Sequence, residues 1–428
     1  MFARKGLLIT LLFVSLVAAL AQTVPQPSRY LYVWARSADT SQPDFLAVVD
    51  ASPSSPTYGK VLSSVSTGVP VNLAHHTDYE MPAGGILFAN DYSSGLTFRF
   101  DLHNPLAPKL LGIFGNAGPY SHPHSFAHLA NGHVLATYQM KGFMNKMPGA
   151  LVELDGNGKL VRYSDAADPA VDSFIRPYSL AVVPALDRVV TSSTDMYGAG
   201  TSHVLQVWRL SDLKRIKTIR LPIGPGRVDG TSAAEPRVLQ DGKTVLVEAE
   251  NCGLYRIVGL GSDNPSVELV YDAGVGTACG VPAVAGHFWI ETLSHGKPQM
   301  PLINLGGGGD AGHSMGPQEG KESHAVVALD VCDPAKPVEV GRVDLGPQDY
   351  PHWLSVDSTG KRVVLTGFEN LQNQVVIINI GDKGELTIDS HFHDAQSGAE
   401  AGIRFARERW PHGGTGAAVP HGAVFSGN

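Results

Sequence analysis

The apolar positions of this chain fall in short segments of five to eight residues, each followed by a polar or glycine-containing turn. Within these segments β-branched and aromatic residues are frequent and often alternate with polar ones, which is the pattern of β-strands. The stretches 84–115, 243–274 and 324–346 repeat one order of strands and turns, and 45–68 and 203–222 repeat its second half. Beyond residue 21 no segment keeps a helical period. The pattern therefore predicts an all-β protein.

The repeat indicates a particular all-β architecture. A unit of about 45 to 55 residues with four short strands is typical of a β-propeller blade. Seven such units follow one another, at about 28–73, 74–122, 123–176, 177–234, 235–279, 280–350 and 351–390. We therefore predict a seven-bladed β-propeller with four-stranded blades. A pair of β-sandwiches is the alternative, but one turn pattern recurring at one spacing favours the propeller.

The ends of the chain and one insertion stand apart from this repeat. Residues 294–323 enlarge the sixth unit and have little strand propensity, so a long loop is expected there. Residues 22–390 are assigned to the propeller, and 391–428 to a C-terminal tail that could cover the mouth of the channel. Pairing of the segment 29–37 with the last unit is expected to close the ring, because closure removes exposed sheet edges.

The N-terminus has the features of a signal peptide. Arg4 and Lys5 precede an apolar run, and Ala19-Leu20-Ala21 resembles a cleavage site. The apolar run is short for a bilayer span, and no stop-transfer segment follows it. We expect residues 1–21 to be removed and the mature protein to be periplasmic or secreted, with a retained anchor as the alternative.

Charge and cysteine content narrow the range of partners. The net charge is −8 and no basic run is present, which argues against binding to nucleic acid or to anionic membranes. The spacing of Cys252, Cys279 and Cys332 includes no CxxC motif, so a thiolate metal cluster is not expected. An oxidising compartment would allow one disulfide among the three, and the sequence leaves its pairing open.

Histidines occur at one recurring position of the repeat. The segment 120–139 alone holds four, which are His122, His124, His128 and His133. In a propeller the first strand of each blade lines the channel, so equivalent positions of different blades converge on the axis. At the openings of these first strands stand His75 and His76 in blade two, His124 in blade three, Tyr178 in blade four, Glu235 in blade five and His352 in blade seven.

Imidazoles from separate rigid elements that converge on one point predict a metal site. Such donors suit copper, zinc, iron or nickel, and do not suit calcium or magnesium. In an extended strand the two adjacent histidines of blade two point to opposite faces, so one of them is expected to coordinate. The tail could add a ligand or a lid, since His412 and His421 each lie in a Pro-His-Gly motif. The alternatives are hydrogen-bonded structural histidines and a plain ion pair between Glu235 and Arg237.

Several segments resemble the selenium-binding-protein family, which includes the methanethiol oxidases. They are "PDFLAVVDASPSSPTYGKV", "LAHHTDYE", "SHPHSFAHLANG", "SHVLQVWRL" and "PHWLSVDSTGKRVVLTG", and the resemblance spans most of residues 40–365. The resemblance implies a seven-bladed propeller and, for the oxidases, a copper-dependent reaction of a small thiol with oxygen that yields an aldehyde, hydrogen sulfide and hydrogen peroxide. The histidines of blades two and three carry over, and that of blade seven more loosely. This chain has Gly59 where many members have a cysteine, and it ends in "WPHGGTGAAVPHG" instead of a cysteine-bearing segment.

Three functional hypotheses follow. In the first, a histidine-bound metal ion, copper before zinc or iron, oxidises a small thiol or other sulfur compound, and Glu235 or Tyr178 accepts a proton or orients the substrate. In the second, the propeller is a non-catalytic metal- or ligand-binding scaffold. A lactonase-like hydrolase is the third, and it would be expected to use an oxygen-rich, calcium-type site.

Overall fold

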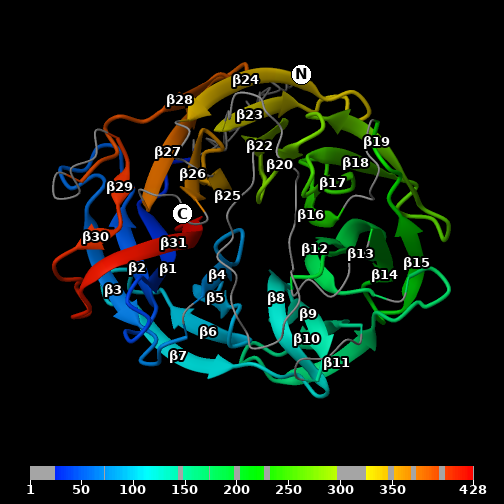
Figure 1. The fold of residues 1–428 in the computed structure, drawn as a ribbon, viewed down its shortest axis with the longest axis horizontal. Coiled ribbons are helices and arrows are strands. Elements are labelled where there is room, and N and C mark those ends of the chain that lie inside the picture. The colour runs from blue at the N-terminus through cyan, green and yellow to red at the C-terminus, as the bar shows by residue number, and fades with distance from the viewer. Residues whose placement is uncertain are drawn as a thin grey trace, which may run out of the picture.

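A computed structural model describes residues 25–71, 73–142, 148–172, 174–196, 203–225, 232–295, 324–345, 351–367, 373–394 and 401–427. Seven antiparallel sheets follow one another around a ring, and each has a core of four strands (Figure 1). The prediction of a seven-bladed β-propeller is thereby confirmed. Among the described residues the only helical element is one 3-10 turn, η1 (Pro184–Leu186).

The strands are numbered along the chain, and each blade is described from the channel outward. Blade one contains β31 (Gly416–Phe425), β1 (Tyr30–Ser37), β2 (Phe45–Asp50) and β3 (Val61–Ser66), and β30 (Ala406–Arg407) pairs with β31. Blade two contains β4 (Ala74–Thr77), β5 (Ile86–Asp91), β6 (Leu96–Asp101) and β7 (Lys109–Phe114). Blade three contains β8 (Tyr120–His128), β9 (Val134–Lys141), β10 (Ala150–Leu154) and β11 (Leu160–Asp165). Blade four contains β12 (Pro177–Val183), β13 (Arg188–Ser193), β14 (Val204–Arg209) and β15 (Arg215–Arg220).

The last three blades follow the same plan. Blade five contains β16 (Ala233–Val238), β17 (Val245–Ala249), β18 (Gly253–Val258) and β19 (Ser266–Asp272). Blade six contains β20 (Thr277–Ala278) and β21 (Ala283–Ala285), which both pair with β22 (Phe288–His295), then β23 (His324–Asp330) and β24 (Val338–Leu345). Blade seven contains β25 (Pro351–Val356), β26 (Arg362–Gly367), β27 (Gln374–Ile380) and β28 (Leu386–Ile388), and β29 (Ile403–Arg404) pairs with β27.

The ring closes within blade one, where the two ends of the chain meet. Strand β1 pairs with β31, so that Leu31 faces Phe425 and Val33 faces Ala423. The N-terminal strand thus takes part in closure as expected, but its partner is the C-terminal strand and not the seventh unit. Residues 28–73 supply only three strands, and β31 supplies the fourth, innermost one. Residues 416–425 of the expected tail and lid are therefore part of the propeller wall, because they cover an otherwise open sheet edge.

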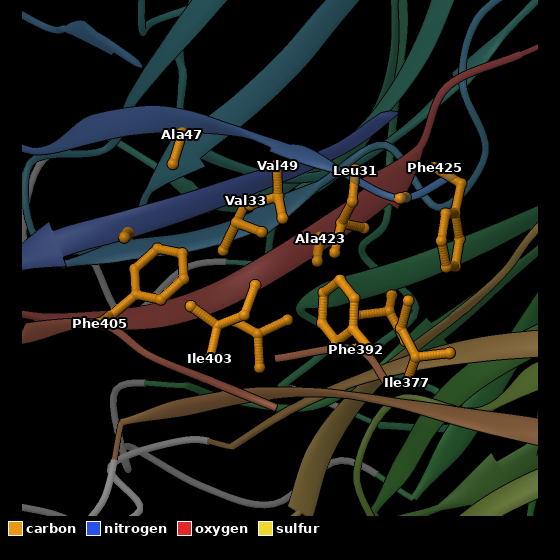
Figure 2. Packing of buried hydrophobic residues seen from close by; sticks show 14 of the residues in the cluster. Leu31, Val33, Ala47, Val49, Ile377, Phe392, Ile403, Phe405, Ala423 and Phe425 are labelled. Atoms are coloured by element: carbon orange, nitrogen blue, oxygen red, sulfur yellow. The ribbon is translucent and has the colours of Figure 1, made fainter. Parts of the chain in front are cut away.

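Apolar side chains fill the spaces between neighbouring blades. At the junction of blades one and seven, Phe392, Ile403 and Phe405 pack in one cluster with side chains of β1, β2, β27 and β31 (Figure 2). All three are fully buried. These three side chains thus reinforce the point at which the ring is closed.

The innermost strands share one irregularity that positions the site. In blade two, Ala74 faces Asp91 and Thr77 faces Ala89, so the inner strand contains one residue more than its partner. The same one-residue bulge occurs in β8, β12, β16, β25 and β31, while in blade six the inner strand is split into β20 and β21. A bulge re-aims the side chains that it contains. In six blades, therefore, the side chains at the bulge of the inner strand point in other directions than they would in a regular strand.

The structure also shows how the cysteines pair. A disulfide joins Cys252 to Cys279, and Cys332 is exposed and unpaired. The expected signal peptide, residues 1–21, and residues 296–323 of the expected loop lie outside the described residues. In the part of the chain that is described, no helix has the length and apolar character needed to cross a bilayer.

Candidate metal centre

Five histidines from four consecutive blades meet near the axis of the ring. They are His352 of blade seven, His421 of blade one, His75 and His76 of blade two and His124 of blade three. Neighbouring ring centroids are 4.8 Å apart for His352 and His421, 4.5 Å for His421 and His75, 3.9 Å for His75 and His76, and 4.6 Å for His76 and His124. We call this group the histidine centre.

The bulges explain why these rings meet. Each of the five residues lies in the bulge of its inner strand, between the residues where the pairing register shifts. The structure differs from the expectation that His75 and His76 point to opposite faces, since their rings are stacked and only 6° from parallel. The extra residue in β4 breaks the alternation on which that expectation rested. Nitrogen atoms of His75, His76 and His421 lie within 4.8 Å of one another.

Burial makes the centre suitable for a ligand. His76 and His124 are completely buried, and His75 and His421 are 2% exposed. Among the described residues, no hydrogen-bond partner is found for either ring nitrogen of His76, for Nδ1 of His75 or for Nε2 of His124. A buried polar atom without a partner costs free energy, so these nitrogens call for an occupant that they can bind.

One hydrogen bond fixes the chemistry of His124. Its Nδ1 lies 2.8 Å from the backbone oxygen of Tyr178, and a carbonyl oxygen can only accept, so Nδ1 carries the proton. The lone pair is then on Nε2, which is the atom without a partner. This arrangement is the one by which metal-binding histidines are usually oriented.

The electrostatics keep the imidazoles in the form that binds metals. Burial lowers the pKa of His124 to about 3 and that of His352 to about 4. Burial, followed by repulsion from the neighbouring imidazoles, also lowers the pKa of His75, His76 and His421 well below the usual value. At pH 7 the rings are therefore neutral, and neutral imidazole is the ligand form. A donor set of nitrogens without a carboxylate suits copper, zinc, iron or nickel.

A second group of residues lies beside the histidine centre. The hydroxyl of Tyr79 lies 3.0 Å and 3.1 Å from the two carboxylate oxygens of Glu235, to which it donates. Arg237 pairs with Glu235 at 2.9 Å, and its guanidinium lies 3.7 Å from the centre of the Tyr79 ring. Tyr79 stacks on Trp353 at 5.0 Å, and Trp353 lies 4.9 Å from the His76 ring. Packed aromatic rings thus link the centre to a buried carboxylate.

Glu235 and Tyr178, the two residues expected to act in proton transfer, lie in different surroundings. Glu235 forms the ion pair with Arg237 that was the plain alternative, and it is also joined to Tyr79. Burial raises the pKa of Glu235. The Tyr178 ring packs 4.0 Å from the His124 ring, and burial raises its pKa well above the usual value. Sequence reasoning missed Tyr79, although it follows His76 by three residues in the same strand region.

The other histidines of interest lie elsewhere. His412 is not brought into the centre, because its Nδ1 lies 2.7 Å from the hydroxyl of Ser64 and its ring packs on Phe45. In segment 120–139, His128 pairs with Asp78 and His133 with Glu153, so only His124 joins the centre. Gly59 lies in a turn with a φ of +87°, where a side chain would collide with the backbone of His393. A cysteine at that position would not fit this backbone.

Comparison with known proteins supports the fold and a distant likeness. No family model and no curated protein matches the sequence. A hypothetical selenium-binding protein from Sulfolobus tokodaii is 18% identical over 94% of each chain, with a TM-score of 0.67. The periplasmic gluconolactonase of Pseudomonas aeruginosa is 11% identical over 84% of this chain and 94% of its own, with a TM-score of 0.57. A candidate 6-phosphogluconolactonase from Bacteroides fragilis is 10% identical over 95% of this chain and 99% of its own, with a TM-score of 0.59. At these identities the likeness shows the propeller fold alone.

Proposed function

We propose that the histidine centre binds one transition-metal ion, copper in the first place, and that the protein oxidises a small thiol or a related sulfur compound with oxygen. The observation that carries the proposal is the meeting of five neutral imidazoles, of which His75, His76 and His124 are buried and have ring nitrogens that lack partners among the described residues. The distant fold likeness to a protein named as selenium-binding, and the resemblance of the segments around His75, His76 and His124 to that family, support it.

His75, His76, His124, His352 and His421 are the residues that would hold the ion. When bound, copper supplies one-electron redox chemistry and affinity for thiolate sulfur. The chain itself supplies a rigid set of ligands on four blades, so little conformational entropy is lost when the ion binds.

Residues of the chain can also accept the proton that a thiol loses when it becomes a thiolate. Glu235 is a buried carboxylate with a raised pKa, and the Tyr79 hydroxyl touches both of its oxygens. A carboxylate with a pKa nearer neutrality is a better general base at pH 7. In this proposal Glu235 takes up the thiol proton through the hydroxyl of Tyr79. The completely buried ring of Trp353 packs against both Tyr79 and His76, and the Tyr79 ring lies 6.2 Å from the His76 ring.

For methanethiol the proposed reaction is CH₃SH + O₂ + H₂O → HCHO + H₂S + H₂O₂. The carbon is oxidised to the aldehyde, oxygen is reduced to peroxide, the C–S bond breaks, and water supplies the aldehyde oxygen. The test is oxygen uptake by the copper-loaded protein with methanethiol, together with measurement of sulfide and peroxide. The His124→Ala variant should be inactive, and His412→Ala, changed outside the centre, should keep the activity.

Two results would lead to other functions. If the protein binds copper tightly but takes up no oxygen with any small thiol, it is a non-catalytic metal-binding propeller. The lactonase alternative is suggested by the names of two proteins of similar fold. The nitrogen donors of the centre count against it, because an oxygen-rich site would be expected. Hydrolysis of gluconolactone in the presence of calcium would favour it.

We further propose that residues 1–21 direct export to the periplasm or the medium, on the evidence of their charged, apolar and small-residue segments. Cell fractionation together with N-terminal sequencing tests this. Processing close to residue 22 is expected, and a full-length protein in the cytoplasm would refute export.

A further inference from the structure

Two buried glutamates lie together between blades five and six, away from the histidines. Glu248 is on β17 and Glu291 on β22, the second strands of their blades. Glu248 is 1% exposed and Glu291 is 4% exposed. One oxygen of each lies within 4.8 Å of the other and of the sulfur of Cys279. Carboxylates at this depth are rare unless they are paired or bind a cation.

The two carboxyl groups differ in their hydrogen bonds. Both oxygens of Glu291 accept, one from the indole N–H of Trp289 at 3.1 Å and one from the backbone N–H of Thr292 at 2.8 Å. Hydrogen bonds of this kind favour the ionised carboxylate. Neither oxygen of Glu248 has a hydrogen-bond partner among the residues that the structure describes. Glu248 is thus a buried carboxyl group without a hydrogen-bond partner in that part of the chain.

The positive charge of Arg237 lowers the pKa of both glutamates in part, but its guanidinium is paired with Glu235. In the described part of the chain, neither Glu248 nor Glu291 forms an ion pair with lysine or arginine, and Arg237 is engaged by Glu235. Burial, offset in part by the two hydrogen bonds, raises the pKa of Glu291 to about 8. Burial, followed by repulsion from Glu291, raises the pKa of Glu248 well above its usual value. Both shifts express the cost of burying two negative charges side by side, which Arg237 offsets only in part.

A small cavity borders both glutamates. Glu248, Glu291 and Cys279 line it together with apolar side chains such as Leu254 and Leu329. It has room for about one water-sized particle. The sulfur of Cys279 is bonded to Cys252, so it forms part of the wall and is not available as a thiolate. Of the residues that line the cavity, Glu248 and Glu291 are the ones that offer carboxylate oxygens as metal donors.

The geometry points to a second metal site, in which Glu248 and Glu291 bind a divalent cation of the oxygen-preferring class, represented by Mn²⁺. Carboxylate donors suit manganese, calcium and magnesium, whereas the imidazoles of the histidine centre suit copper or zinc. One divalent cation would neutralise both carboxylates and give Glu248 its missing partner. The two sites therefore select different ions, and this inference does not depend on the proposed oxidase activity.

The test is a titration of the full chain with Mn²⁺ at pH 7.5, with the disulfide intact and the histidine centre first saturated with copper. Electron paramagnetic resonance measures the free Mn²⁺. We expect about one bound Mn²⁺ per chain. Binding should weaken at least tenfold in Glu248→Gln and in Glu291→Gln, because each isosteric change removes one charge. Glu339→Gln, which changes an exposed carboxylate paired with Arg342, should bind as the wild type does.

A stability measurement separates a cation site from a shared proton. With Mn²⁺ the melting temperature of the wild type should rise, and that of Glu248→Gln should not, although both fold without the ion. The inference is overturned if the wild type takes up no Mn²⁺ at millimolar concentration. It is equally overturned if Glu248→Gln binds Mn²⁺ as tightly as the wild type does.

Discussion

The buried neutral state of His124 has a measurable effect on stability. Its pKa is about 3 in the folded protein, against a usual value of 6.5, because burial disfavours the charged ring. A group with a lowered folded pKa stabilises the protein fully above the unfolded pKa. That contribution is lost as the pH falls below about 6.5, since the unfolded chain then binds a proton that the folded protein does not.

The size of the effect follows from the two pKa values. Between pH 7.5 and pH 5, protonation of the unfolded chain at a histidine of pKa 6.5 lowers the free energy of unfolding by about 2 kcal/mol, because the folded group remains neutral. Compared with a total stability of about 5–15 kcal/mol, a loss of this size is easy to measure. Buried carboxyl groups have the opposite effect. Burial raises the pKa of Asp44 to about 7, so the contribution of Asp44 to the free energy of unfolding increases as the pH falls.

The experiment isolates His124 by difference. Urea unfolding of the metal-free wild type and of His124→Gln at pH 7.5 and pH 5 gives four free energies, and contributions that the two proteins share cancel. The advantage of the wild type over the variant should shrink by about 2 kcal/mol at the lower pH. His393→Gln, at an exposed residue that forms no ion pair within the described part of the chain, serves as the control and should show no such change. A difference for His124→Gln that stays constant within about 0.5 kcal/mol would refute the buried neutral imidazole.

Three further changes test other parts of the account. Gly59→Cys should destabilise the protein by about 1–3 kcal/mol in urea unfolding, since its φ is +87° and a side chain would meet the backbone of His393; unchanged stability would contradict that turn. Phe425→Ala should lower the free energy of unfolding by about 3–5 kcal/mol, because Phe425 is only 3% exposed in the cluster where β31 closes the propeller. A decrease below about 1 kcal/mol would contradict closure by β31. Tyr79→Phe should lower thiol-dependent oxygen uptake about tenfold or more without changing metal content, because the hydroxyl that touches Glu235 is lost, and full activity would rule out the proton path.

The sequence predicts the fold well because the propeller is built from local patterns. Each blade repeats the same strands and turns, so the first-strand histidines can be aligned without knowledge of the structure. The bulges are different, because they depend on pairing between strands and leave no regular trace in the pattern. For this reason the stacking of His75 on His76 could not be predicted.

The C-terminal residues show a second limit of sequence reasoning. His412 and His421 lie in the same Pro-His-Gly motif, yet only His421 enters the centre. The difference arises from β31, which pairs with a strand almost 400 residues earlier in the chain. Tyr79 was missed for a related reason, since its partner Glu235 lies three blades away and is brought close only by the ring.

The central claim is that the histidine centre binds a transition-metal ion. The most direct measurement is the metal content, by mass spectrometry, of the wild type, His124→Ala and His412→Ala after loading with copper and removal of the free ion. We predict about one ion per chain in the wild type and in His412→Ala, and almost none in His124→Ala, with all three proteins folded by circular dichroism. Full metal content in His124→Ala, or loss of the ion in His412→Ala alone, would contradict the assignment of the site.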